Sequence, residues 1–225
     1  ASDVYKRQHI TFEKTVALAE KWFSPIPRRH VPRRSLPMEP MQTEERRLTV
    51  ERNVPVDALY MAFHMCSRNH PDYYAFDMLS DLLSSGRSSR FVQHLVQDKQ
   101  IFNSIDAYIS GSIDNGLFHI VGKPAPEKTL EEAEKAIWEE LALLTEGSID
   151  ENELEKVKNR YESEQIFNNL NYLNVATNLA YFELIGKAED INTEVEKYRS
   201  VTQEQIKRAA KQTFLPENCS VLYYK

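Results

Sequence analysis

The sequence predicts an α+β fold with two layers, in which one mostly antiparallel sheet carries helices packed on one face. Segments where apolar residues alternate with other residues indicate strands, and segments with an apolar stripe at helical spacing indicate helices. After an N-terminal helix and linker, these segments follow the order β-β-α-α-β-β-α-α-α-α-β. This order is not the strict strand–helix alternation of a parallel α/β sheet, so we expect the helices to gather on one side.

The composition excludes several classes of protein. Hydrophobic residues make up 41% of the 225 residues, which is enough for a core, so wholesale disorder is excluded. No apolar run approaches the ~20 residues of a membrane-spanning helix. Two cysteines cannot form a disulfide framework or a cysteine-based zinc site. The formal charge of −6, without a basic tail on the main part of the chain, argues against nucleic-acid binding.

The first 44 residues are predicted to form one helix and a linker. Residues 11–23 carry apolar residues at helical spacing, with Thr11 as a plausible N-cap. Residues 24–44 are rich in proline and contain the run RRHVPRR, and proline cannot sit inside a helix or a central strand. A single helix has no core of its own, so it must belong to another domain or pack back onto this one.

The next segments predict two strands and two helices. RRLTVER (46–52) and DALYMAFHM (57–65) alternate as strands do, and the apolar face of the second consists of Leu59, Met61, Phe63 and Met65. Residues 70–86 read as a helix with Pro71 in its first turn and Gly86 as its stop. Residues 88–98 read as another short helix that a serine begins.

The corner between these two helices, Gly86-Arg87-Ser88-Ser89-Arg90-Phe91, is the most distinctive local feature. In a structural interpretation its arginines bond nearby carbonyls or carboxylates. In a functional interpretation they contact an anion or substrate. Helix capping explains every residue except the choice of arginine.

The remaining segments complete the sheet and its helices. Residues 103–110 and 115–122 predict a hairpin with its turn around Gly111–Asn115. Helices are expected over 130–144, from a capping box at Ser148 and Glu151, over 170–185, and from a second box at Thr202 and Gln205. NCSVLYY (218–224) ends the chain as a strand.

No catalytic or metal-binding set is visible. The histidines are not spaced as ligand pairs on a helix, and both HExxH and HxxEH are absent; they are His9, His30, His64, His70, His94 and His119. Neither Cys66 nor Cys219 has a nucleophile signature around it, and a reduced structural role is expected for both. We therefore predict no catalytic residue and no metal ligand in this chain.

The order of these signals resembles the second, non-catalytic domain of the M16 (pitrilysin or insulinase-like) zinc peptidases. The matching pieces are ERRLTVERNVPVDALYMAFHM, YYAFDMLSDLLSSGRSSRFVQHLV and GSIDENELEKVKNR. ITFEKTVALAEKWFSPIP resembles the closing helix of the family's first domain. The resemblance implies a LuxS/M16 metallopeptidase-like fold, with residues 1–27 as the tail of the preceding domain, 28–44 as linker and 45–225 as the C-terminal inactive domain.

The resemblance also implies a division of labour between two halves that close on an unfolded peptide. Zinc and the HxxEH motif would lie in the missing first half, so this chain alone is predicted to be inactive, without a cofactor, and to form one wall of the peptide chamber. Its partners would be its own first domain or a second M16 subunit, with a homodimer possible in isolation. Many members place an Arg/Tyr pair in the second half to hold substrate, but the hairpin strand 116–120 lacks arginine, and Tyr108 is only a weak candidate.

Two other interpretations stay open at this stage. The chain could come from an inactive M16-like scaffold subunit that pairs with an active one, and the sequence upstream of Ala1 would discriminate the two. It could also be an unrelated α+β binding module, which disorder in residues 9–27 would favour. The compartment, cytoplasm or periplasm, is left undetermined, because a start upstream of Ala1 would hide an export signal.

Overall fold

The computed structural model describes residues 10–29, 37, 39–111 and 113–225. Its strands are β1 (Arg46–Val50), β2 (Ala58–Ser67), β3 (Phe102–Ser110), β4 (Asn115–Pro124) and β5 (Cys219–Tyr224). Its α-helices are α2 (Phe12–Phe23), α3 (Tyr73–Ser84), α4 (Leu130–Glu146), α5 (Glu151–Asn168), α6 (Tyr172–Ile185), α7 (Glu194–Arg199) and α8 (Gln203–Thr213). A π-helix, η1 (Phe91–Asp98), and two 3₁₀ helices, η2 (Ala188–Thr193) and η3 (Pro216–Asn218), complete the described elements.

The five strands form one sheet in the order β1-β5-β2-β4-β3. The pairs β5–β2, β2–β4 and β4–β3 are antiparallel, and only β1–β5 is parallel. The prediction of a mostly antiparallel sheet is therefore confirmed. The last strand of the chain lies inside the sheet, between the first two.

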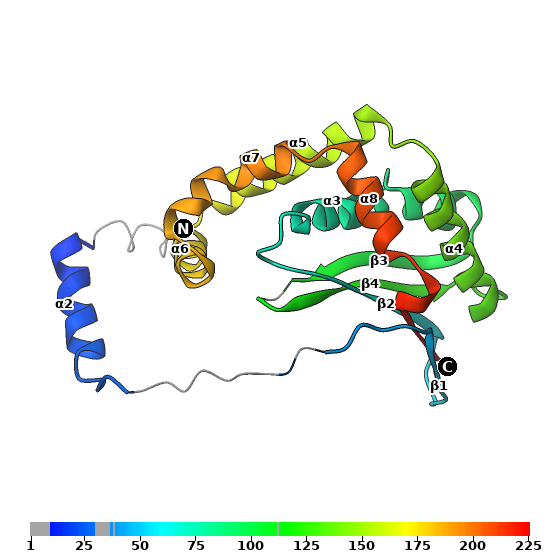
Figure 1. Cartoon of the computed structure of the whole chain (residues 1–225), viewed down its shortest axis with the longest axis horizontal. Helices are drawn as coiled ribbons and strands as arrows, with labels where there is room; N and C mark the ends of the chain where they lie inside the picture. Colours follow the sequence, from blue (N-terminus) through cyan, green and yellow to red (C-terminus); the bar gives the residue numbers. More distant parts are fainter. Residues whose placement is uncertain (1–9, 30–36, 38, 112) are drawn as a thin grey trace.

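Helices cover one face of this sheet, as the sequence predicts (Figure 1). The predicted inward residues of β2 are all buried; they are Leu59, Met61, Phe63 and Met65. The ring of Phe63 packs edge-on against Trp138 of α4 at 5.7 Å and against Phe214, just after α8, at 5.2 Å. The burial of these aromatic side chains holds the two layers together.

The predicted helix ends are confirmed in part. Thr202 and Gln205 form the expected capping box at α8, and Gly86 adopts φ +89° after α3. The capping box at Ser148 is wrong, because α5 begins two residues later than that box requires. The N-cap is Asp150, whose side chain accepts a hydrogen bond from the Asn152 amide.

The helix after the Gly86 corner also differs from the prediction. It begins at Phe91 as a π-helix, and no serine caps it. Ser89 closes the turn instead, since both its amide and its hydroxyl donate to the Gly86 carbonyl oxygen. The wider helix still buries Phe91 and Leu95, two of the residues expected to face inward.

Residues 188–199 contain two short helices, η2 and α7, that are not predicted from the sequence. They bring Glu194 and Tyr198 against the side of α3, where both side chains are buried. Glu194 there becomes the ion-pair partner of Arg68, which lines the pocket described below.

The predicted N-terminal helix is confirmed as α2, with Thr11 as its N-cap. The residues of α2 form a helix and are therefore not disordered. None of them is buried, so the helix is not docked on the sheet. Of the predicted linker, residues 30–36 and 38 lie outside the described residues. Its far end is fixed by Gln42, whose buried amide donates to the Cys219 carbonyl oxygen at 2.8 Å. Among the described helices, none is long and apolar enough to cross a bilayer.

Candidate functional site

The histidines of the described residues are spread over the molecule. His94 contacts Glu140 through Nδ1 at 2.7 Å, His119 contacts the Ser110 hydroxyl at 3.2 Å, and His70 accepts a hydrogen bond from the Asp72 amide. His9 and His30 lie outside the described residues. Within the described part of the chain, no group of three or more His, Cys, Asp or Glu residues could hold a metal ion.

The two cysteines are poor nucleophiles. Burial raises the pKa of the Cys66 thiol to about 11 and that of Cys219 to about 12. A thiol must ionise to attack, so both groups are unreactive at neutral pH. This environment supports the structural role expected for them.

The Gly86–Arg90 corner has a structural use for one of its arginines. Arg90 binds the carboxylate of Glu153 on α5 in a two-point contact, with both N–O distances at 2.9 Å. It also donates to the Ser148 carbonyl oxygen. This geometry favours the structural interpretation of the corner, because Arg90 joins η1 to the start of α5.

The uncovered side of the sheet, here called the open sheet face, is the first candidate site. The strand registers place one apolar row across it that ends in an acid: Leu48, Leu222, Tyr60, Val121 and Asp106. A second row lies beside it: Arg46, Ser220, Ala62, His119 and Tyr108. A hollow of about 390 Å³ lies over the part of these rows nearest β1 and β5.

The open sheet face is apolar at its centre and charged at its edges. Arg46 stands on the β1 edge and Asp106 on the β3 edge, whereas the residues between them in the two rows carry no formal charge apart from the titratable His119. Tyr108, the weak substrate-holding candidate, lies on this face and stacks on His119 with ring centroids 4.9 Å apart. An antiparallel sheet that meets only water normally presents polar residues on its exposed face. This face is therefore suited to contact another molecule or domain.

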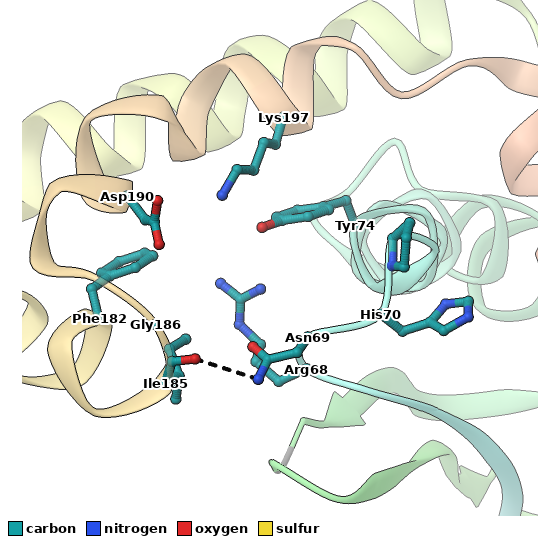
Figure 2. A pocket seen from close by; sticks show the side chains of 10 residues that line it. Arg68, Asn69, His70, Tyr74, Phe182, Ile185, Gly186, Asp190 and Lys197 are labelled. Atoms are coloured by element: carbon teal, nitrogen blue, oxygen red, sulfur yellow. Dashed lines mark hydrogen bonds between the residues drawn. The ribbon is translucent and has the colours of Figure 1, made fainter.

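A second pocket lies between the end of β2, α3, α6 and α7 (Figure 2). It measures about 260 Å³, and we call it the Arg68 pocket. Arg68 is buried and pairs with the buried carboxylate of Glu194, and its guanidinium lies 4.4 Å from the ring of Tyr73. The Tyr74 hydroxyl donates to the other oxygen of Glu194 at 3.1 Å.

The charges of the Arg68 pocket are balanced. Lys197 lies 3.7 Å from Glu194, and the Asp190 carboxylate accepts a hydrogen bond from the Lys187 amide. Figure 2 shows Arg68, Lys197 and Asp190 around the same space, with Phe182 on one side. Each charged group already has a partner in the protein. The pocket therefore serves to hold α6 and α7 against the end of β2 and α3, rather than to activate a substrate.

Neither the open sheet face nor the Arg68 pocket was predicted from the sequence, for different reasons. Arg68 and Glu194 are 126 residues apart, and no local pattern links them. The open sheet face could be recognised in part, because the second phase of β2 is also apolar apart from His64, as in a strand covered on both sides. That second phase places Tyr60 and Ala62 on the open sheet face.

The sequence of this chain is similar to known proteins of one family. The pattern of the peptidase M16 inactive domain matches residues 9–161. Two zinc proteases are similar in sequence. The uncharacterized YmxG of Bacillus subtilis is 24% identical over 87% of this chain and 47% of its own length, and PqqE of Helicobacter pylori is 22% identical over 96% and 49%. The chain thus spans about half the length of these curated relatives.

Solved structures show the same fold. A protease from Helicobacter pylori superposes on 96% of this chain and 53% of its own, with a TM-score of 0.85 and 22% identity. The five-stranded sheet, its helical layer and the family pattern over most of the chain agree with one another. The chain therefore belongs to the peptidase M16 inactive domain family.

Proposed function

We propose that this chain is the substrate-holding half of a two-half zinc peptidase, with the open sheet face as one wall of the peptide chamber. The observation that carries the proposal is the apolar centre of that face, which no described helix of the chain covers, in a chain of the M16 inactive domain family. An unfolded peptide exposes the apolar side chains that such a wall would take up. The relatives named zinc proteases, of which this chain spans about half, supply the reaction class.

In this proposal the hydrolytic chemistry belongs to the other half. Zinc bound there would supply a Lewis acid and an activated water for peptide hydrolysis. This chain binds and orients the peptide, and residues 1–27 form the tail of the preceding domain with 28–44 as linker. M16 inactive domains pair with other M16 domains or subunits, so the other half lies either in the same protein or in a second subunit.

The first experiment is to read the coding sequence upstream of Ala1. An HxxEH motif followed by a later glutamate is the expected result. A preceding M16 half without these ligands would contradict the peptidase proposal for this protein. It would make the chain part of an inactive partner subunit, and the active subunit would then be sought by co-purification.

The second experiment tests the wall itself in the complete two-half protein. Leu48→Asp places a charge in the apolar row, at a side chain exposed enough for the fold to tolerate it. We expect kcat/KM for a long unfolded peptide to fall at least about tenfold, with unchanged zinc content and melting temperature. Leu143→Asp, on the outer surface of α4, is the matched control and should leave kcat/KM unchanged. Equal activity of the two variants would refute the role of the open sheet face.

A further inference from the structure

Many exposed apolar side chains are concentrated on the end of α5 and on α6. We call residues 166–185 the α5–α6 arm. Eight of its large apolar side chains are between 39% and 74% exposed: Ile166, Phe167, Leu170, Tyr172, Leu173, Leu179, Tyr181 and Leu184. Within α6, only Phe182 is buried. Exposed apolar side chains concentrated in this way indicate an interaction site.

The sequence of α6 indicates that the helix is covered on more than one side in the working protein. Most of the 14 residues in YLNVATNLAYFELI are apolar, and they point in all directions around the helix. A helix that is apolar all round is buried in a larger assembly or spans a membrane. Fourteen residues are too few to span a bilayer, so a protein partner remains.

The root of the arm is held firmly, which makes it a fixed surface rather than a loose end. Phe182 and Ile185 line the Arg68 pocket, and the Asn69 amide donates to the Ile185 carbonyl oxygen at 3.4 Å. The buried Arg68–Glu194 pair fixes α7, which follows the arm in the chain. The arm therefore presents its apolar side chains in a fixed position before any partner binds.

The helix α2 indicates which partner this is. Its side chains Phe12, Trp22 and Phe23 are 65–79% exposed, and none of its residues is buried. A short amphipathic helix needs an apolar surface to pack on, and none of the residues of α2 is buried against the described part of this chain. Figure 1 places α2 and α6 at the same end of the long axis, with α4 at the other end. A domain that packs around α2 would thus lie at the end where the arm is exposed.

We infer that the α5–α6 arm is the docking surface for the M16-type half that packs around α2. This inference rests on the proposed two-half architecture and adds the surface by which the halves recognise each other. The arm buries its aromatic and aliphatic side chains against an apolar helical surface of that half. The open sheet face stays free for the peptide.

Thiol labelling tests the inference in the complete two-half protein and, separately, in the 225-residue chain. Leu170→Cys and Leu184→Cys replace exposed side chains, so neither change disturbs the core. Leu143→Cys on α4 is the matched control at 58% exposure. Peptide mapping by mass spectrometry separates these sites from the native Cys66 and Cys219. We expect maleimide to label all three new thiols at similar rates in the 225-residue chain.

In the complete protein, the thiols at 170 and 184 should react at least about tenfold more slowly, while the thiol at 143 keeps its rate. Equal labelling of all three in the complete protein would overturn the inference, whatever the peptide cleavage shows. Protection at 170 and 184 in a protein that cleaves no peptide would support the docking surface and contradict the proposed peptidase function. Labelling thus tests the docking surface and cleavage tests the peptidase function, and either proposal can be refuted without the other.

Discussion

Arg68 is a buried charged side chain with one acidic and two aromatic neighbours. Glu194 supplies the opposite charge, Tyr74 bonds to the same carboxylate, and Tyr73 stacks on the guanidinium. Burial by itself lowers the pKa of Arg68, but these neighbours outweigh it, and the net shift is upward. The arginine is therefore charged at every pH at which the protein folds, so its pairing with Glu194 is a permanent part of the structure.

Breaking this pair should destabilise the protein strongly. Arg68→Ala leaves the Glu194 carboxylate buried without its charged partner, and we expect a loss of about 3–5 kcal/mol in the free energy of unfolding. Arg208→Ala is the control, because its ion pair with Asp72 is exposed on the arginine side and should cost less than about 1 kcal/mol. Urea unfolding of the two variants measures the difference. Equal losses would show that the Arg68–Glu194 pair contributes little.

Asp81 on α3 should make stability depend on pH. Burial, and then the nearby Asp77, raise its pKa to about 6, against about 3.9 for an unfolded aspartate. Between these pH values the folded state binds more protons at Asp81 than the unfolded state does. The contribution of Asp81 to the free energy of unfolding is therefore greatest below about pH 4 and is lost as the pH rises through 6. Asp81→Asn should remove this contribution, which amounts to about 2–3 kcal/mol.

The measurement is urea unfolding of both proteins at pH 4.5 and pH 7.5. The wild type should lose about 2 kcal/mol more than Asp81→Asn between these conditions, because part of the contribution is already lost at pH 4.5. Asp77, whose pKa is also raised, is present in both proteins, so the comparison reports Asp81 together with its coupling to Asp77. Parallel pH dependence in the two proteins would contradict the assignment to Asp81.

At the scale of elements, the start of α5 gives a direct test of a corrected prediction. Asp150 caps the helix, whereas Ser148 contributes only its backbone carbonyl to Arg90. Asp150→Ala should therefore cost about 1 kcal/mol of stability, and Ser148→Ala less than about 0.5 kcal/mol. Chemical unfolding of the two variants checks the order. The reverse order would restore the capping box at Ser148 and Glu151.

Elements with a strong apolar pattern could be predicted from the sequence, and those made by distant contacts could not. The inward face of β2 and the buried stripe of α4 follow directly from their residue spacing. By contrast, η2 and α7 are short and strongly charged. They form because Glu194 meets Arg68 and Tyr198 donates to Asp77, across more than 100 residues of chain.

One part of the candidate site could be predicted from the sequence and another part could not. The open sheet face could be anticipated in part, since Tyr60 in the second phase of β2 and its partners Val121 of β4 and Leu222 of β5 are apolar or aromatic. The absence of an arginine from the hairpin left the substrate-holding residues unassigned, and the structure adds only that Tyr108 lies on the open sheet face. The Arg68 pocket depends on four elements that meet only in the folded chain.

At the scale of the whole molecule, this chain should not hold zinc. We expect well below one zinc per chain after dialysis against metal-free buffer, and no peptide cleavage by the 225-residue chain alone. The described residues bring no three potential ligands together, which is the physical reason for the expectation. Elemental analysis by mass spectrometry measures the zinc content. One tightly bound zinc per chain, with cleavage that a chelator abolishes, would overturn it.

The place of β5 inside the sheet has a consequence for biosynthesis. The segment Cys219–Tyr224 lies between β1 and β2 in the sheet. The complete sheet can therefore form only after residue 224 has emerged from the ribosome. Until then β2 has an unpaired edge, and β1 has no strand to pair with, because β5 lies some 170 residues away in the chain. A nascent chain in this state is a natural client for chaperones, and a stop codon just before Cys219 would leave it there permanently.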